Sequence, residues 1–522
     1  MTRTDLAVAA TFVLAAAVTF WKLNPADMPV IVDTQVYFFI AERAASGVPP
    51  HISEFDPKNA LSMLLTAAAI RLGRIVGADD LMSARALSMA VTAAAFPMLW
   101  LCAWRLFASR LAAFVAPMVL LLFTDYLSLA VAGSRPKVVL VFFLIAWMLA
   151  MTTRRPLLIG ALASTCFLTW QPALLVLPVA LLAVGWTSTR ARRDVAMMLA
   201  GAVLPLLCYE TYFLAHGALR EQLYQSLIFP AQYGKDAPDL ELNLTRIFSM
   251  EEGRGVRMVA MALYSAVLAT WWVLALAAPA LRRRWTSARP DRIALMLAAT
   301  GTLTFIVLDY QGFPDRFLIL PFIALADAWA LAAVANALRP LAARAVAMPK
   351  GALRAGGLVL AAVIALGWAA TRPYQQYRGR GLAEQRQAAA YVGSLLEKGK
   401  AVYVVSSLHL LAMNRTANHT QHGFFPVRIR RYMAERVREE GRFLPLKDGR
   451  LPDFILTSRM QPPGMPTLLR SYRELRRPLM RAQGIAVHRL RKDVKPTPLP
   501  AATRPRRHPQ RDPAPADAQR IR

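Results

Sequence analysis

The sequence contains few cysteines, and their positions exclude two kinds of site. The 522-residue chain has only three, Cys102, Cys166 and Cys208. Each falls inside an apolar block, and the three are too far apart in the sequence to form a thiolate metal motif. We therefore expect neither a disulfide nor a cysteine-bound metal ion.

Acidic residues are also scarce, with 32 Asp and Glu against 62 Lys and Arg, so the net charge is +30. Such a charge is compatible with nucleic-acid binding, but the arginines cluster between apolar blocks and in the last third of the chain. Basic residues in these positions orient a chain and anchor it to anionic lipid. We therefore expect membrane lipid, and no nucleic acid, as a partner.

Two further features are missing. The first apolar block, from Leu6 to Trp21, is not followed by the small-residue pattern of a cleavage site, which predicts a retained signal anchor. No internal repeat is visible, whereas many transporters are built from repeats. This absence counts against a transporter.

Apolar sequence, by contrast, is abundant, because 56% of the residues are hydrophobic. A helix of roughly 20 apolar residues crosses the ~30 Å hydrocarbon layer. The sequence therefore predicts a mostly α, polytopic membrane protein with about eleven transmembrane helices. The candidate spans are 5–22, 82–104, 111–131, 138–152, 157–171, 173–186, 195–215, 258–281, 293–309, 317–337 and 355–371.

Basic connections between these spans predict the topology. The segments "RLFASR", "TTRRP", "TSTRARRD" and "ALRRRWTSARPDR" alternate with less basic connections, as the positive-inside rule requires of cytoplasmic loops. The apolar block 157–186 is broken at "WQP" and flanked by basic segments on both sides, so we expect it to cross twice. The N-terminus is then cytoplasmic and the C-terminal end extracytoplasmic, in the inner membrane of a bacterium.

The composition predicts three parts: a membrane domain over 1–372, a soluble α/β domain over 373–492, and a disordered basic tail over 493–522. In the second part, "LAEQRQAAAYVGSLLEKG" has helical spacing, while "AVYVVSS", "PDFILTS" and "GIAVHRLR" are typical of strands. His409, His419 and His422 lie close together there, but no carboxylate or cysteine joins them at ligand spacing. Ordinary histidines are favoured over a metal site.

The long connection after the first span holds the ionisable residues of greatest interest. Asp33 is followed by "QVYFFIAERAASG", whose apolar residues have helical spacing, and then by "EFDPKNALSMLLTAAAIRLG", which contains Asp56 and Lys58. Both segments are too short or too charged to span, so we expect helices lying in the membrane interface. Ionisable groups at a membrane edge are costly and are therefore functional candidates.

The order of these features resembles the first periplasmic loop of the polyprenyl-phosphate-dependent glycosyltransferases of the GT-C superfamily. That group includes the protein O-mannosyltransferases and the lipid A aminoarabinose transferases. The segments "LTWQPALLVLP", "ETYFLAHGALREQLYQSLIFPAQYG" and "FPDRFLILPFIALADA", and the closing α/β domain, are similar to features of the same group. The resemblance covers most of residues 1–490.

The resemblance implies inverting transfer of a sugar from a polyprenyl-phosphate donor to a hydroxyl group of a glycan, lipid or protein on the extracytoplasmic face. Asp33 matches the general base of the family, and Lys58 matches the residue that meets the donor phosphate. The other candidates for phosphate contact are Arg135, Lys137 and Arg316. Thr34 stands where many members carry a second acid, so Asp56 and Asp125 are secondary acidic candidates, and a divalent metal ion is an open expectation.

Simpler interpretations compete with these roles. Asp33 is also suited to capping a helix, Lys58 to anchoring at the interface, and Arg135 and Lys137 to marking the membrane edge. Weaker candidates are Tyr209, Glu210, Asp309, Asp315 and His51. At the level of the whole protein, the alternatives are a non-catalytic cell-envelope scaffold and a lipid or sugar transporter.

Overall fold

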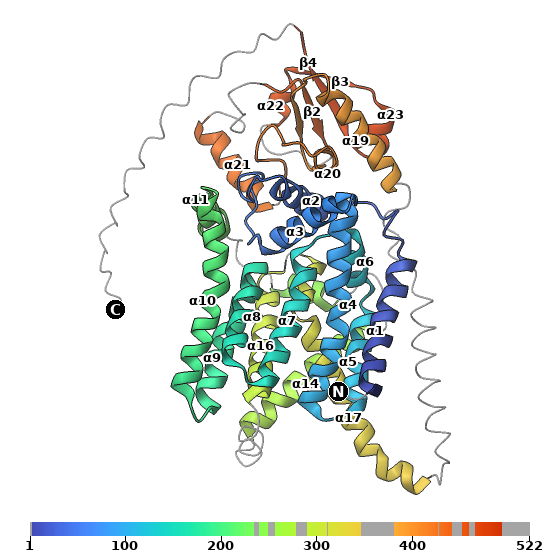
Figure 1. The fold of residues 1–522 in the computed structure, drawn as a ribbon, viewed down its shortest axis with the longest axis vertical. Helices are drawn as coiled ribbons and strands as arrows, with labels where there is room; N and C mark the ends of the chain where they lie inside the picture. Colours follow the sequence, from blue (N-terminus) through green and yellow to red (C-terminus); the bar gives the residue numbers. More distant parts are fainter. Residues whose placement is uncertain are drawn as a thin grey trace, which may run out of the picture.

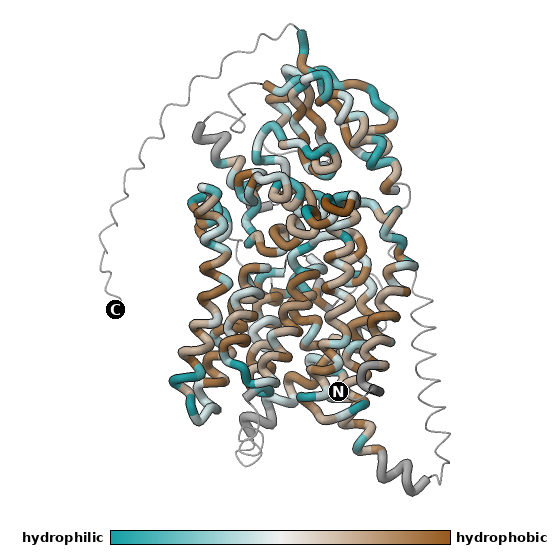
Figure 2. Tube along the Cα trace, in the orientation of Figure 1, coloured by the Kyte–Doolittle hydropathy of each residue, from teal (hydrophilic) through white to brown (hydrophobic). Residues whose placement is uncertain are grey.

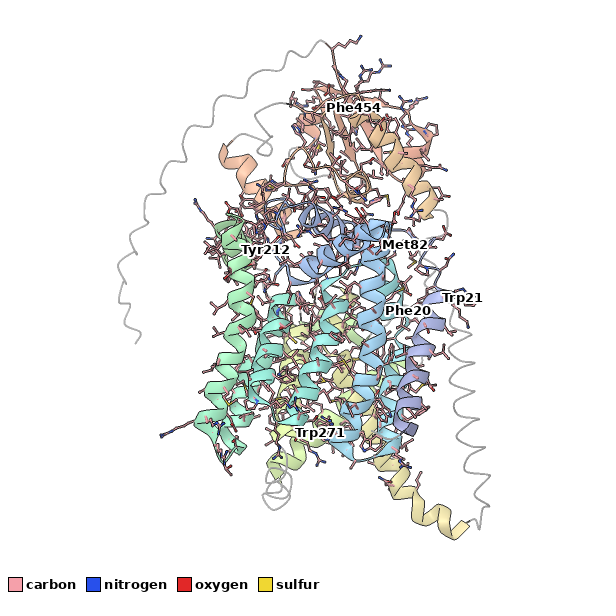
Figure 3. All side chains as sticks on the ribbon, viewed as in Figure 1. Phe20, Trp21, Met82, Tyr212, Trp271 and Phe454 are labelled. Carbon is pink, nitrogen blue, oxygen red and sulfur yellow. The ribbon has the colours of Figure 1, made fainter. Side chains whose placement is uncertain are left out.

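The computed structural model of the protein is a helical bundle with a small sheet domain over one end (Figure 1). The structure describes residues 3–233, 240–248, 256–277, 290–310, 312–345, 381–425, 427–440, 451–458 and 465–492. Apolar residues dominate the bundle, and hydrophilic residues are frequent in the sheet domain (Figure 2). We call the end of the bundle that faces the sheet domain the domain end; Met82 and Tyr212 lie near it, and Trp271 lies near the opposite end (Figure 3).

The helices of the first half of the chain follow one another closely. They are α1 (Arg3–Lys22), α2 (Val32–Ala45), α3 (Leu61–Ile75), α4 (Asp80–Phe107), α5 (Arg110–Leu122), α6 (Thr124–Ala132), α7 (Pro136–Thr153), α8 (Pro156–Thr169), η1 (Gln171–Leu175), α9 (Val176–Thr187) and α10 (Ala191–Ala215). Local sequence explains several boundaries: the Asp79 side chain accepts the N–H of Met82 at 3.0 Å and caps α4.

The remaining membrane-side helices are shorter or separated by segments outside the described residues. They are α11 (Leu219–Leu223), η2 (Tyr224–Ile228), α12 (Phe229–Gln232), α13 (Leu240–Phe248), α14 (Val256–Ala277), α16 (Pro290–Leu308), η3 (Phe313–Leu318) and α17 (Leu320–Ala345).

Within the described part of the chain, five helices are long and apolar enough to cross a membrane, namely α4, α7, α10, α16 and α17. The pair α5 and α6 is bent by 63° and makes a sixth span if the pair crosses once. Shorter apolar helices lie in α1, α8, the η1 and α9 segment, and α14. The protein is therefore a multi-pass membrane protein. A helix overlaps each of the first ten predicted spans, the range 355–371 lies outside the described residues, and the count of eleven stays a prediction.

Two glycines allow α8 and α10 to pack closely. A Cβ on Gly160 would lie 1.8 Å from the Met198 carbonyl oxygen, and a Cβ on Gly201 would lie 2.0 Å from the Leu157 carbonyl oxygen. Small residues at such crossings let helix backbones approach in a membrane protein. Only glycine fits at these two positions.

Helices α2 and α3 form a layer between the bundle and the sheet domain (Figure 1). The α2 residues Val36, Tyr37, Phe38, Phe39, Ile40 and Ala41 are each at most 3% exposed. Six consecutive buried residues cover every face of a helix, so protein surrounds α2 on all sides, and its place in the membrane interface stays a prediction. Helix α3 does keep an exposed apolar side, on which Leu72 and Ile75 lie.

The sheet domain contains four strands, β1 (Val402–Val404), β2 (Phe454–Thr457), β3 (Tyr472–Leu475) and β4 (Ala486–Leu490), in the order β1-β2-β4-β3. Strands β1 and β2 are parallel, with Val402 opposite Phe454, and the other two pairs are antiparallel. The three strands expected from the sequence are present, and β3 is an addition. The helices of this part are α19 (Leu382–Leu396), α20 (His409–Ala412), α21 (Val427–Glu440), α22 (Met465–Leu469) and α23 (Pro478–Ala482). The predicted tail over 493–522 lies outside the described residues.

Candidate functional site

Helix α2 places Asp33 in its first turn, at the domain end of the bundle. The N-cap residue is Ile31, with no side-chain cap hydrogen bond, and a carboxylate in the first turn is stabilised by the helix dipole. Asp33 is a half-buried residue, whereas Thr34 and Val36 beside it are buried.

Three basic side chains act on Asp33. Burial raises its pKa, but the positive charges of Lys58, Arg135 and Lys137 outweigh that effect, and the pKa of Asp33 lies below its ordinary value. Asp33 is therefore ionised at neutral pH, as a general base must be. The structure thus brings together four of the residues selected from the sequence.

Lys58 lies on the connection between α2 and α3 and donates a hydrogen bond to the Tyr37 hydroxyl. Its ammonium group is also 4.9 Å from the centre of the Tyr37 ring. Burial lowers the pKa of Lys58, but Tyr37, Asp56 and Asp33 raise it further, so Lys58 stays charged. Tyr37 had no role assigned from the sequence, although it is four residues after Asp33 and therefore on the same helix face.

Arg135 lies in the turn between α6 and α7, and its Nε donates to the Thr34 hydroxyl at 2.9 Å. The turn begins at Gly133, which has φ +128° and where a Cβ would lie 3.3 Å from Thr34 Cγ2. Glycine is favoured there by both the backbone conformation and the close contact. Thr34 therefore binds Arg135 in the position where a second acid was expected.

Lys137, at the start of α7, pairs with Asp315 of η3. Its ammonium group is 4.5 Å from the centre of the Trp170 ring. Arg316 follows Asp315 and lies 5.7 Å from the centre of the Tyr310 ring. The Lys137 pair therefore holds η3, and Arg316 with it, against the start of α7.

The two secondary acids are placed differently. Asp56 is buried, its backbone N–H donates to Gln225 Oε1 at 3.1 Å, and its Oδ2 has no partner among the described residues. Burial raises the pKa of Asp56 to about 6, although Lys58 opposes the shift. Asp125 lies in the first turn of α6, whereas Arg135 follows the end of that helix.

The weaker candidates take mainly structural positions. The Tyr209 hydroxyl accepts the N–H of Ala60 at 2.8 Å. His51 is buried against Gln225, and burial lowers its pKa to about 4. Glu210 is partly buried in α10, and Asp309 follows α16.

The described residues contain no group of three or more His, Cys, Asp or Glu side chains that would hold a metal ion. The positive charges of Lys58, Arg135 and Lys137 act on Asp33, and positive charges repel a metal ion. These residues therefore do not fit a divalent metal, and we derive no step through one. In the sheet domain, burial lowers the pKa of His409 to about 3 and that of His422 to about 4.

The buried side chain of Arg85 connects the segments that lead to the site. Arg85 of α4 donates hydrogen bonds to the Pro25 and Met28 carbonyl oxygens and, at 3.3 Å, to the Ala132 carbonyl oxygen. These acceptors lie before α2 and at the end of α6. Arg85 therefore fixes the segment that leads to Asp33 against the helix that leads to Arg135.

A lateral groove of about 460 Å³ opens close to the site. Helices α3, α8 and α10 supply most of its apolar walls, with Tyr209 and Arg71 among the lining residues. Tyr209 contacts Ala60, which is two residues from Lys58. Tyr209 therefore joins the wall of the groove to the end of the connection that carries Lys58.

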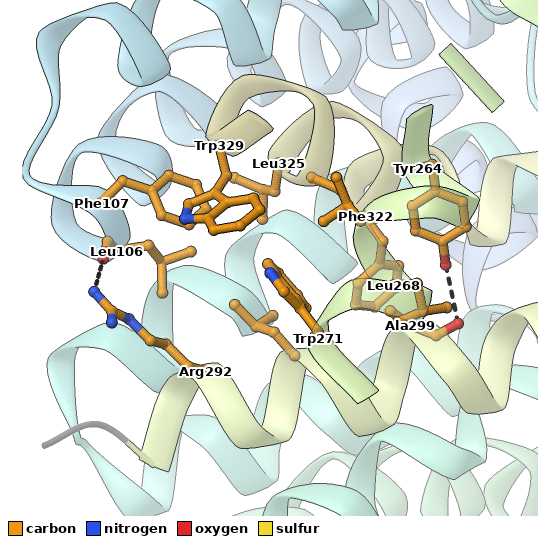
Figure 4. A pocket seen from close by; sticks show the side chains of 13 residues that line it. Leu106, Phe107, Tyr264, Leu268, Trp271, Arg292, Ala299, Phe322, Leu325 and Trp329 are labelled. Carbon is orange, nitrogen blue, oxygen red and sulfur yellow. Dashed lines mark hydrogen bonds between the residues drawn. The ribbon is translucent and has the colours of Figure 1, made fainter. Parts of the chain in front are cut away.

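A second pocket, of about 30 Å³, lies at the opposite end of the bundle, between α14, α16 and α17 (Figure 4). Trp271 and Trp329 lie in its wall, Arg292 donates to the Leu106 carbonyl oxygen at 3.0 Å, and Tyr264 donates to the Ala299 carbonyl oxygen at 3.0 Å. Its size and its distance along the bundle from Asp33 separate it from the candidate site.

A helical membrane bundle beneath a small α/β domain is a fold that this chain shares with solved structures of glycosyltransferases. Among solved structures it is similar to ArnT from Cupriavidus metallidurans bound to undecaprenyl phosphate, with 15% identity, a TM-score of 0.57, and coverage of 93% of this chain and 98% of that chain. It is also similar to the oligosaccharyltransferase AglB from Archaeoglobus fulgidus in complex with an inhibitory peptide and a dolichol-phosphate, with 11% identity, a TM-score of 0.52, and coverage of 95% and 75%.

No protein-family profile matches the sequence, and no curated protein matches it. At these identities the similarity establishes the fold and leaves the chemistry to the residues of this chain. The resemblance stated from the sequence is confirmed at the level of the fold.

Proposed function

We propose that the protein is a glycosyltransferase that moves a sugar from a polyprenyl-phosphate donor to a hydroxyl acceptor at the domain end of the bundle. The observation that carries the proposal is that the positive charges of Lys58, Arg135 and Lys137 act on Asp33, a half-buried residue whose carboxylate they keep ionised. The fold supports it, because ArnT binds undecaprenyl phosphate and AglB binds a dolichol-phosphate.

In this reaction Asp33 removes the proton from the acceptor hydroxyl as the acceptor oxygen attacks the anomeric carbon. The bond between that carbon and the phosphate oxygen breaks, and its electron pair goes to the leaving polyprenyl phosphate. Attack from the face opposite the phosphate inverts the configuration of the sugar. The products are the glycosylated acceptor, polyprenyl phosphate and protonated Asp33, which releases its proton to water.

The basic residues of the site have the second role in the reaction. Lys58 and Arg135 stabilise the negative charge that develops on the departing phosphate, as preorganised donors do in general. Lys137 is neutralised by Asp315, so its role is to hold η3 and present Arg316. The lateral groove lined by α3, α8 and α10 is suited to the polyprenyl chain, because it is apolar and open toward the lipid.

The positive-inside pattern assigns the domain end to the extracytoplasmic face of a bacterial inner membrane. Lipid-linked sugars are then delivered from the membrane, and acceptors from the aqueous side or the same leaflet. The sheet domain lies at the same end of the bundle as α2, the helix that carries Asp33 (Figure 1).

The test uses the purified full-length chain in lipid nanodiscs with radiolabelled polyprenyl-phosphate sugars and a glycan, lipid or peptide acceptor. We expect time-dependent release of polyprenyl phosphate with transfer of label to one acceptor class. The proposal is contradicted if undecaprenyl phosphate does not bind the protein and no donor of the panel is consumed.

A further inference from the structure

Glu54 lies on the connection between α2 and α3 and contacts the sheet domain. Its carboxyl group is fully buried, and Oε1 accepts the backbone N–H groups of Gly423 at 2.7 Å and Phe424 at 2.9 Å. A side chain from the membrane part thus binds two main-chain donors of a loop that is 369 and 370 residues away in the sequence.

Phe55 extends the same contact. Its backbone N–H donates to the Gln421 carbonyl oxygen at 2.6 Å, and its ring stacks on the His422 ring at 5.3 Å with an interplanar angle of 19°. Glu54 and Phe55 are therefore paired with the loop 421–424 through main chain, carboxyl group and ring. These contacts leave little freedom for either segment.

The loop of the sheet domain is shaped for the Glu54 carboxyl group. A Cβ on Gly423 would lie 2.5 Å from Leu408 Cδ2, 2.6 Å from Asn418 Nδ2 and 3.1 Å from Glu54 Oε2. Any side chain at this position would push the loop away from Glu54. The fit therefore depends on residues of both partners.

The segment held in this way continues directly into Asp56 and Lys58. On its other side, the Gln171 amide donates to the Pro57 carbonyl oxygen at 2.7 Å. The Lys58 connection is thus fixed from the bundle by Gln171 and from the sheet domain by Glu54. Without the second support, the main chain before Lys58 loses a hydrogen-bonded anchor on one side.

From these contacts we propose that Glu54 is a positioning residue, through which the sheet domain sets the place of Lys58 and so the affinity for the donor phosphate. The inference rests on the proposed function of the same site. Burial raises the pKa of Glu54, although the two backbone donors oppose the shift; glutamine has nearly the same shape and keeps an oxygen that accepts hydrogen bonds.

The test measures the Kd of undecaprenyl phosphate and the KM and kcat for the sugar donor in full-length variants. Glu54→Leu removes the acceptor for two backbone donors, and we expect Kd and KM to rise about tenfold. Glu54→Gln keeps an acceptor and should stay within about twofold of wild type. Glu397→Gln, a change of an exposed glutamate at the end of α19, is the matched control and should change nothing.

Gly423→Ala tests the contact from the sheet domain, and it is informative even if Glu54→Leu does not fold. It should raise Kd in the same direction although Gly423 is not a phosphate ligand, and the double variant should be no weaker than the weaker single variant. Unchanged Kd in folded Glu54→Leu or Gly423→Ala protein, or additive losses, would overturn the inference. Failure of the wild-type chain to bind undecaprenyl phosphate would instead remove the proposed function on which it rests.

Discussion

Arg135 donates a hydrogen bond from Nε to the Thr34 hydroxyl at 2.9 Å, and so joins the turn after α6 to the residue that follows Asp33. Because Arg135 also lowers the pKa of Asp33, this bond fixes a cation beside the proposed base. A hydroxyl group thus stands where the resemblance led us to expect a second acid, and it orients a positive charge rather than adding a negative one.

Thr34→Val removes the hydroxyl group that accepts the hydrogen bond from Arg135. A hydrogen bond to a charged group contributes about 1.5–3 kcal/mol, so we expect kcat to fall about tenfold. Thr34→Ser keeps the hydroxyl and should retain most of the activity. Steady-state kinetics on the two variants makes the comparison. Equal activity in the valine and serine variants would show that Arg135 is held by something else.

Lys58→Met should raise the KM for the donor by about 100-fold, because the methionine lacks the charge that meets the phosphate. The side chains are similar in length, so the change in packing is small. Lys398→Met, at an exposed position after α19, serves as the control. A donor KM that is unchanged in Lys58→Met protein would rule out phosphate contact by Lys58.

Because the pKa of Asp56 is raised, we expect the affinity for the donor to depend on pH. Its pKa is raised to about 6, so it is neutral below that pH and negatively charged above it. The charged form repels the donor phosphate, and we expect the donor KM to rise by roughly fivefold from about pH 5 to about pH 7.5, which corresponds to about 1 kcal/mol.

Neither the donor phosphate nor Asp33 changes its charge in this pH range, so the pH dependence is assigned to Asp56. The sugar donor is a phosphodiester and lacks the second phosphate pKa of about 6 that a monoester has, and Asp33 stays ionised across the range because its pKa is lowered. Asp56→Asn protein should therefore have a low donor KM that does not rise near pH 6. A step of the same size in the variant would assign it to another group.

Gly160→Ala should destabilise the protein by about 1–3 kcal/mol, since the new methyl group overlaps a backbone oxygen and α8 must move away from α10. Thermal unfolding in detergent measures the change. Gly185→Ala is the control, because a Cβ there meets only Val195 Cγ2 at 3.8 Å. Similar unfolding temperatures for the two variants would contradict the close packing of α8 and α10.

Hydrophobic periodicity and the distribution of arginine were enough to predict the helices of the bundle, the break at "WQP" and three strands of the sheet domain. They did not reveal that protein surrounds α2, because an apolar pattern on one face does not show that the sheet domain covers the other face. Strand β3 was missed since Tyr472 to Leu475 carries two charged residues and lies at the edge of the sheet.

Only part of the site was predictable from the sequence. Asp33, Lys58, Arg135 and Lys137 stand out as ionisable groups at a membrane edge, and the structure brings them together. Glu54 and Thr34 act through contacts with Gly423 and Arg135, and no local pattern in the sequence records a partner that is about 100 or more residues away.

The central claim is that Asp33 is the base of a sugar transfer, and Asp33→Asn in the purified chain tests it most directly. Asparagine keeps the shape but accepts no proton, so we predict that kcat falls by a factor of about 10²–10⁴ while the Kd of undecaprenyl phosphate changes little. Asp27→Asn, an exposed position in the connection between α1 and α2, should retain full activity. Sugar transfer at the wild-type rate by Asp33→Asn protein would contradict the account.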